Sequence, residues 1–306
     1  MITRQKISQF FIIILFQNIL FSQDDLISIP ETLDPDQSYF SILISPDQSY
    51  IGLTNSNYTT LEIINQKTSK NTNVYVPFIN TFQAKWSPDS DKLLLLRSRY
   101  DNKRRANSLI LINHQGDFVE TIVDFTNQNL YPLGWTGSNT LHYLSGDKLI
   151  TYSLEGSDNE WDHPLVYAIK NKLYRKINNQ EHEILYTAEN RILNVSSSRD
   201  GSLVAFEVYG SHVIIIDNLK AVTTDLGIGN GPKVSPNGKM VTFMVLEDNG
   251  YQITSGDVYT WDLVSKEIKA VAHDPEFIEM NPVWSSDDLV SYIIYPEGLV
   301  KTVSIK

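Results

Sequence analysis

Short apolar runs separated by polar turns extend along almost the whole chain after its first residues. Aliphatic and β-branched side chains dominate these runs, as in Leu93–Leu96, Leu203–Phe206 and Val213–Ile216. Such runs, bounded by Pro, Asp, Asn and Gly, are typical of short β-strands. No stretch beyond the N-terminal segment repeats its apolar positions with the period of a helix. We therefore predict an all-β protein.

A turn motif recurs between these strands and marks an internal repeat. Ser45-Pro46-Asp47 reappears as Ser87-Pro88-Asp89. Looser copies are Thr136-Gly137-Ser138, Ser198-Arg199-Asp200-Gly201, Ser235-Pro236-Asn237-Gly238 and Ser285-Ser286-Asp287-Asp288. Pro presets the first corner of such a turn, Asp or Asn bonds to nearby backbone donors, and a following Gly accepts a left-handed conformation. Gln48, Ser90 and Asp288 occupy that last position in three copies, so we expect weaker turns there.

Tryptophans and turn spacing together predict a ring of blades. Trp86, Trp135 and Trp284 precede three turns in one register. The repeats average about 40 residues, which is the period of a four-stranded propeller blade. We predict a β-propeller of four-stranded antiparallel blades, seven if residues 164–190 form a degenerate repeat and six if they elaborate a neighbour. The alternative is a β-sandwich or several small β domains, but these rarely repeat one turn and one tryptophan register.

The first residues resemble an export signal. Arg4 and Lys6 precede the largely apolar run Phe10–Phe21, and the small residue Ser22 suits the position before a cleavage site. This run is shorter than the roughly 20 residues of a spanning helix. We predict a signal peptide over residues 1–22, with a retained N-terminal anchor as the alternative. A single domain is expected over residues 24–306, with Leu26–Ile29 completing the last blade and closing the ring.

The Ser-Pro-Asp turn, the preceding tryptophan and the hairpin that follows resemble the repeats of TolB-like and WD-like β-propellers. They are also similar to the propeller half of prolyl-oligopeptidase-type peptidases. The strongest segments are Trp86–Ile112 and Ser235–Val271. The resemblance implies an exported, often periplasmic, propeller that binds proteins or ligands through one face. Blades are scaffolds that serve many tasks, so the resemblance is more specific for fold than for function.

Composition excludes several classes of protein. The chain has no cysteine, which excludes a disulfide scaffold, a thiolate metal site and a cysteine nucleophile. Its formal net charge of −11 argues against nucleic acid as a partner. The sequence lacks the G-x-S-x-G elbow of a peptidase with this type of propeller. We therefore predict a protein that is not an enzyme, needs no cofactor or metal, and does not stay in the membrane after signal cleavage.

Cations gather in one segment of this acidic chain. They are Arg97, Arg99, Lys103, Arg104 and Arg105, in the connection between the second and third strands of a repeat. Such a loop suits carboxylates, phosphates or an acidic partner; the alternative is an ordinary solvated loop, which is the commoner case for a run of charges. The corresponding connection Glu247–Asp257 is also long, carries acidic residues and Tyr251, and is expected on the same face. We predict that these residues, with Tyr251, bind another envelope or secreted protein.

Two other functions remain open from the sequence. An enzyme or carbohydrate-binding propeller would have its site at the channel mouth, and would require histidine or acidic side chains to converge near the axis. The histidines are His114, His142, His163, His182, His212 and His273, and they form no recognised metal motif. Alternatively, the chain could be a propeller partner of separate catalytic chains.

Overall fold

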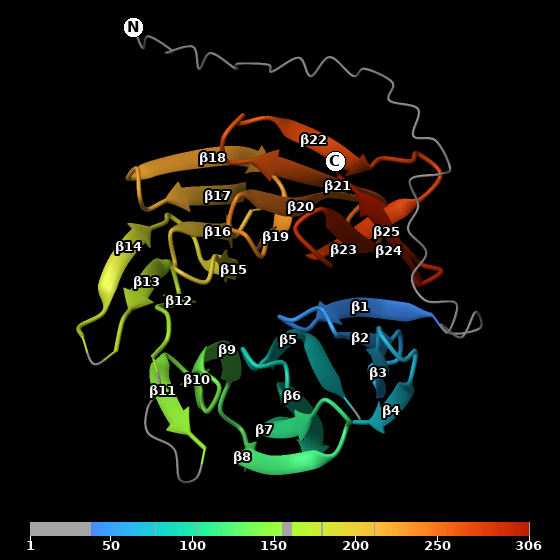
Figure 1. Cartoon of the computed structure of the whole chain (residues 1–306), viewed down its shortest axis with the longest axis vertical. Coiled ribbons are helices and arrows are strands. Elements are labelled where there is room, and N and C mark those ends of the chain that lie inside the picture. The colour runs from blue at the N-terminus through green and yellow to red at the C-terminus, as the bar shows by residue number, and fades with distance from the viewer. Residues whose placement is uncertain are drawn as a thin grey trace, which may run out of the picture.

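The computed structural model describes residues 38–76, 78–101, 103–154, 161–178, 180–210 and 212–305. Within these residues every regular element is a β-strand, as the apolar pattern predicts. The strands form sheets arranged around a common centre (Figure 1). The predicted all-β propeller architecture is therefore confirmed. The predicted signal peptide and the closing segment Leu26–Ile29 lie outside the described residues.

Five of the sheets are separate blades of three or four strands. The first contains β1 (Tyr39–Ile44), β2 (Tyr50–Asn55), β3 (Thr60–Asn65) and β4 (Asn71–Tyr75). The second contains β5 (Ile79–Trp86), β6 (Lys92–Asp101), β7 (Arg104–Asn113) and β8 (Phe118–Thr126). The third blade has three strands, β9 (Leu130–Gly137), β10 (Thr140–Ser145) and β11 (Lys148–Ser153). The fourth also has three strands, β12 (Leu165–Ile169), β13 (Lys172–Lys176) and β14 (Glu183–Thr187). The fifth contains β15 (Ile192–Ser197), β16 (Leu203–Val208), β17 (His212–Asp217) and β18 (Val222–Ile228).

The remaining strands form one continuous seven-stranded sheet. They are β19 (Asn230–Val234), β20 (Met240–Asp248), β21 (Ile253–Asp262), β22 (Ile268–Ala272), β23 (Ile278–Trp284), β24 (Leu289–Tyr295) and β25 (Leu299–Ser304). Strand β21 pairs with β22 over Val258–Trp261 and, nearer its start, pairs in parallel with β23 through Gly256 and Ile278. A Cβ on Gly256 would lie 2.9 Å from the carbonyl oxygen of Glu279, so glycine permits this approach.

The blade count predicted from the sequence is therefore wrong. We expected seven four-stranded blades, or six, whereas the structure has five blades of three or four strands and the continuous sheet β19–β25. The number differs because the β21–β23 pairing joins strands that turn spacing alone would assign to separate units. Residues 164–190 do form a unit of their own, the blade β12–β14, but it has three strands and not four. Turn spacing reports connections along the chain and carries no information about pairing between distant strands.

The repeated turn owes its shape to one serine hydroxyl. The Ser45 hydroxyl donates to the Asp47 carboxylate and accepts the backbone N–H of Tyr50, which starts β2. Ser87, Ser198 and Ser235 make the equivalent pair of hydrogen bonds. These serines are buried, so a hydroxyl without partners would be costly there. The Ser-Pro-Asp motif is thus a structural element that starts the second strand.

The last turn position has the same backbone conformation whether or not it is glycine. Gln48 and Ser90 have φ of 61°, close to the 68° of Gly201 and Gly238. The turns at Gln48 and Ser90 therefore have the same geometry as the glycine turns. A left-handed conformation costs a non-glycine residue roughly 1–2 kcal/mol, so these two turns are energetically weaker than the glycine turns, as expected.

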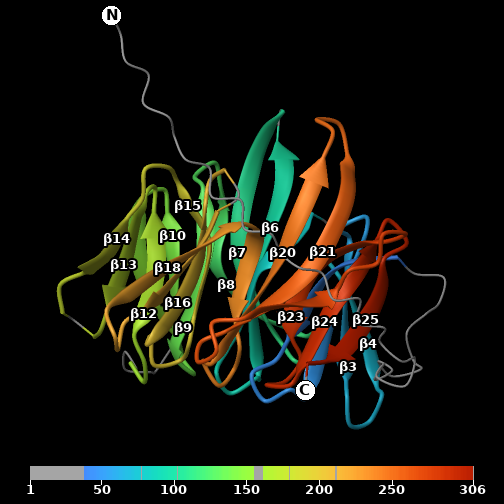
Figure 2. The same cartoon turned by 90° about the horizontal axis from the view of Figure 1, so that it is seen from above.

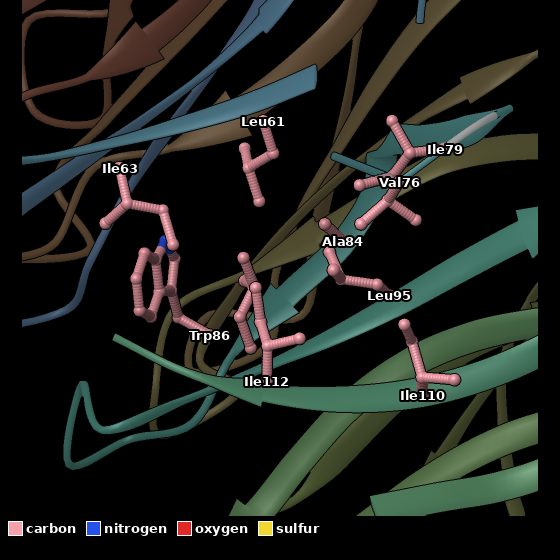
Figure 3. Packing of buried hydrophobic residues seen from close by; sticks show 10 residues of the cluster. Leu61, Ile63, Val76, Ile79, Ala84, Trp86, Leu95, Ile110 and Ile112 are labelled. Atoms are coloured by element: carbon pink, nitrogen blue, oxygen red, sulfur yellow. The ribbon is translucent and has the colours of Figure 1, made fainter. Parts of the chain in front are cut away.

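Apolar side chains fill the spaces between neighbouring sheets. Leu61 and Ile63 on β3 pack against Trp86, Leu95 and Ile112 of the next blade (Figure 3). Two of the three tryptophans in the register also hydrogen-bond to a neighbouring first strand, whereas the buried indole N–H of Trp86 has no partner among the described residues. The indole N–H of Trp135 donates to the Lys85 carbonyl at 3.1 Å, and that of Trp284 donates to the Lys233 carbonyl at 2.8 Å. The first bond ties β9 to β5 of the preceding blade, and the second ties β23 to β19 within the seven-stranded sheet.

The first and last sheets meet and close the ring. Ile42 and Leu53 share an apolar cluster with Ile293 of β24. The Asn281 side-chain amide of β23 donates to the Phe40 carbonyl of β1 at 2.9 Å. Packing of β1 on β23 and β24 therefore closes the described part of the molecule (Figure 1).

Candidate functional site

A channel runs through the centre of the ring. One cavity of about 800 Å³ is lined by residues of the first strands of the blades and of β19 and β23. A second cavity, of about 790 Å³, lies toward the starts of β9 and β15 and the end of β12. Lys85 and Asn194 line both cavities, so the two adjoin and together form the channel.

The larger cavity has cationic and apolar walls. Lys85, Lys233, His163 and Arg199 line it, and no described Asp or Glu does. Burial lowers the pKa of Lys85 to about 8, and the neighbouring charge of Lys233 lowers it further in the same direction. The second cavity contains two acidic residues, Asp147, which forms an ion pair with Lys170, and Glu189. Among the described residues, both acidic side chains thus belong to the second cavity, and the larger cavity has no pair of carboxylates on its walls.

Most histidines lie in separate surroundings. His142 is fully buried in β10, between the hydroxyls of Thr136 and Thr151 at 2.8 and 3.1 Å. Burial, and secondarily His163, lowers its pKa to about 3, so this imidazole is neutral at ordinary pH. His114, His212 and His273 each lie within 4 Å of a different aspartate. Among the described residues no three His, Cys, Asp or Glu side chains are grouped as a metal ion would require.

The segment rich in cations is the end of a long hairpin. Strands β6 and β7 pair over ten positions from Lys92–Asn113 to Asp101–Arg104. Lys103, at the tip, has φ of 66°, which closes the turn. The hairpin rises beyond the rest of its blade (Figure 2). The segment that the sequence predicted to be a loop is therefore mainly an extension of the two strands. The backbone pairing of β6 with β7 continues through Arg97, Arg99 and Arg105.

The five cations of this hairpin divide into two groups. The guanidinium groups of Arg99 and Arg97 lie over the Phe125 ring, 4.0 and 4.9 Å from its centre. Arg105 donates from Nε and Nη2 to the buried Ser98 hydroxyl at 3.0 and 2.9 Å. Lys103 and Arg104 are exposed, and neither has a side-chain partner among the described residues. The hairpin thus holds three arginines against Phe125 and Ser98, although Arg99 and Arg105 remain exposed, and leaves Lys103 and Arg104 without a side-chain partner among the described residues.

Aromatic side chains accompany these cations. Tyr100 on β6 is 65% exposed and meets the edge of Phe78, which is 56% exposed, with ring centres 6.3 Å apart. These two adjacent rings together form an exposed aromatic patch and not a single exposed apolar residue. Arginine and tyrosine are the residue types that most often supply binding energy at protein interfaces.

A second hairpin rises from the same face. The strands β20 and β21 extend upward beside the other sheets, as β6 and β7 do (Figure 2). Glu247 and Asp248 are exposed near its tip, and Tyr251 is 98% exposed. Asp257 does not face outward, because it accepts a bond from Tyr259 and lies 2.9 Å from His273. The predicted placement of the two segments on one face is confirmed by the structure.

Three charged residues near these features were missed from the sequence. Lys85 and Lys233 each stand two residues before a turn serine, Ser87 and Ser235. Aligning the repeats on that serine would have revealed two lysines at one structural position. Glu279 is 3% exposed, and burial with the nearby charges of Asp257 and Asp274 raises its pKa to about 7. No sequence signal identifies Glu279, because its burial depends on β23 approaching β21.

Comparisons with known proteins establish the fold. The structure is similar to the β-propeller domain of Cps50 (Swd1) from Myceliophteria thermophila, with a TM-score of 0.58 and 12% identity over 88% of this chain and 97% of that chain. Hsv2 from Kluyveromyces lactis has a TM-score of 0.57 and 10% identity, over 87% of this chain and 92% of that chain. TolB from Acinetobacter baumannii has a TM-score of 0.53 and 15% identity, over 79% of this chain and 56% of TolB. The resemblance to TolB-like and WD-like propellers is confirmed at the level of the fold.

The sequence comparisons add no family. No family model matches this sequence, and no curated protein matches it. In the described residues no helix is long and apolar enough to span a membrane.

Proposed function

We propose that this chain is an exported, non-enzymatic β-propeller, TolB-like in kind, that binds a protein partner. The interaction surface is the face that bears the β6–β7 and β20–β21 hairpins. The observation that carries this proposal is that both hairpins project from one face with opposite charge and exposed aromatic tips. Propellers of this type commonly serve as scaffolds for recognition through one face, and the loops and hairpins of a rigid scaffold often carry function.

The surface chemistry favours a protein over other partners. Lys103 and Arg104 offer charge without internal partners, while Tyr100, Phe78 and Tyr251 offer exposed apolar area. A partner with an acidic patch facing β6–β7 and a basic one facing β20–β21 would match both hairpins. Opposite charges at two separate points fix the orientation of a partner as well as attracting it.

Export is supported by the N-terminal pattern of Arg4, Lys6 and Phe10–Phe21. The proposed location is the periplasm or the exterior, and the proposed partner is another envelope or secreted protein. Mass spectrometry of the protein purified from its own cells tests this directly. A mature chain that begins at Gln23 supports export, and an intact chain in the cytoplasm contradicts it.

A double charge reversal at the basic tip tests the interaction surface. Lys103→Glu with Arg104→Glu changes two exposed residues, whereas Arg105 is left intact because it braces Ser98. We expect partner binding to weaken by about tenfold or more, and to lose much of its salt dependence. Binding is measured by quantitative capture from an envelope fraction at two salt concentrations.

The matched control is Lys67→Glu with Lys70→Glu. These two exposed lysines lie in the β3–β4 turn, at the opposite end of the strands from the β6–β7 tip (Figure 2), and the net charge changes equally. Captured proteins that fall with the hairpin variant and remain with the control support the proposal. Equal capture by wild type and both variants would refute it.

A further inference from the structure

Two lysines occupy one structural position in two different sheets. Lys85 on β5 and Lys233 on β19 each precede the turn serine by two residues, and both line the larger channel cavity. Their backbone carbonyls are the acceptors for Trp135 and Trp284, which fixes both strands next to the channel. The corresponding position is Leu43 in the first blade and Ser196 in the fifth. The positive charge is therefore specific to two sheets and is not a property of the repeat.

Neither ammonium group has a partner in the described part of the chain. Neither lysine takes part in a side-chain hydrogen bond or an ion pair there, and none of the described residues lining the cavity is Asp or Glu. Arg199 and His163 line the same cavity and add further positive potential. This concentration of cations occurs in a chain whose formal net charge is −11. Charged groups that are half-buried usually have a counter-ion, because desolvation is otherwise uncompensated.

The lysines also influence each other. Burial first, and then the charge of Lys233, lowers the pKa of Lys85, and burial acts in the same direction on Lys233. Lys85, with a pKa of about 8, remains mainly protonated at neutral pH. An anion placed in the cavity would relieve the repulsion and supply the missing acceptors.

The rest of the wall combines aromatic and apolar residues with uncharged polar ones, mainly serines. Trp86, Trp135 and Trp284 line the cavity, together with prolines and aliphatic residues of β1 and β23. A volume of about 800 Å³ lies within the range of small-molecule sites, which combine apolar walls with a few polar groups that fix orientation. Inorganic ions alone would leave these walls unused.

We propose that the central cavity binds a small organic anion, with its carboxylate or phosphate contacted by Lys85 and Lys233 and its apolar body against the tryptophan-lined wall. This site is separate from the hairpin face and does not depend on the proposed function. The same anionic chemistry could come from a free small molecule or from the C-terminal carboxylate of an inserted peptide. Both sources use the same two lysines.

The test uses the full protein and two pairs of probes, each with an anionic and a neutral member, at constant ionic strength in chloride. Phenyl phosphate represents a free anion, and phenol is its neutral counterpart. A tetrapeptide ending in phenylalanine, with a free or an amidated C-terminus, represents the inserted chain. Calorimetric titration measures affinity, and tryptophan fluorescence reports occupation because three of the five tryptophans line the cavity.

We expect saturable binding of phenyl phosphate or of the free-acid peptide, and none of phenol or the amide. Lys85→Met and Lys233→Met should each weaken binding by about tenfold or more, since a charge-assisted hydrogen bond is lost. Both variants should fold, because methionine keeps the aliphatic stem and removes an unpaired charge. Melting curves verify this.

The control is Lys67→Met, an exposed lysine far from the channel, which should bind as the wild type does. The hairpin variant Lys103→Glu with Arg104→Glu should also bind normally, so failure of the hairpin proposal is distinguishable from failure of this one. Binding of phenyl phosphate identifies a free-anion site, and binding of the free-acid peptide alone identifies an inserted carboxylate. Lack of binding by both probes, or binding that persists in both lysine variants, would overturn the proposal.

Discussion

The β6–β7 and β20–β21 hairpins have nearly the same framework and differ in what surrounds their bases. Their strands have ten residues each in one case and nine and ten in the other, and both rise from one face (Figure 2). One tip carries Lys103 and Arg104, and the other carries Glu247, Asp248 and Tyr251. The comparison teaches that the placement of the hairpins comes from the repeat, while their extra length, their charge and their pH response come from individual residues.

The base of the basic hairpin is held by groups that keep their charge state across the usual pH range. The Ser98 hydroxyl accepts from Arg105 and donates to Asn107, whose amide donates to the Gln128 carbonyl at 3.1 Å. The base of the acidic hairpin holds titratable groups instead. Glu279, Asp257, Asp274, His273 and Lys301 surround the start of β23 and the lower part of β21.

The largest expected difference is in the pH dependence of stability. An unfolded Glu279 ionises near its ordinary pKa of 4.5, whereas burial raises the pKa of the folded residue to about 7. Ionised Glu279 therefore destabilises the folded state fully above pH 7, and this penalty disappears below about pH 4.5. Glu279→Gln should increase the free energy of unfolding by up to about 3 kcal/mol at pH 8 and by little at pH 4.5.

Urea unfolding of wild type and variant at both pH values measures this effect. The glutamine keeps an oxygen for the N–H of Asp274, which Glu279 accepts at 3.4 Å, so packing should be conserved. An equal gain at pH 4.5 and pH 8 would show that the ionisation of Glu279 is not responsible.

A smaller effect, without pH dependence, is expected at the other hairpin. Ser98→Ala removes the acceptor for Arg105 and the donor for Asn107, and both Ser98 and Asn107 are buried. The free energy of unfolding should fall by about 1–2 kcal/mol, by the same amount at pH 4.5 and pH 8. The same urea titrations measure it. A loss that changes strongly between the two pH values would remove the contrast between the hairpins.

The fold class follows from residues that act locally. The serine that bonds to a carboxylate two residues later and to an N–H five residues later leaves a repeated trace in the sequence. The tryptophan that donates to a neighbouring strand leaves another. The blade count does not follow from them, because the Gly256–Ile278 pairing joins segments through a close approach that no local pattern encodes.

The candidate site shows the same limit. Clustering of cations along the sequence identified the β6–β7 hairpin and its Arg104, and the length of the Glu247–Asp257 segment identified its counterpart. The sequence did not show that Arg97, Arg99 and Arg105 are engaged with Phe125 and Ser98. Lys85 and Lys233 come together only because β5 and β19 face one channel, so their shared function depends on ring closure.

Site-specific photo-crosslinking tests most directly whether the hairpin face binds a partner. A photoreactive phenylalanine analogue is placed at Tyr251, at Arg104 or, as the control on the opposite face, at Lys67. The same protein should be crosslinked from both hairpin tips and not from position 67. Crosslinking of a partner from position 67 alone, or equally from all three positions, would contradict binding through this face.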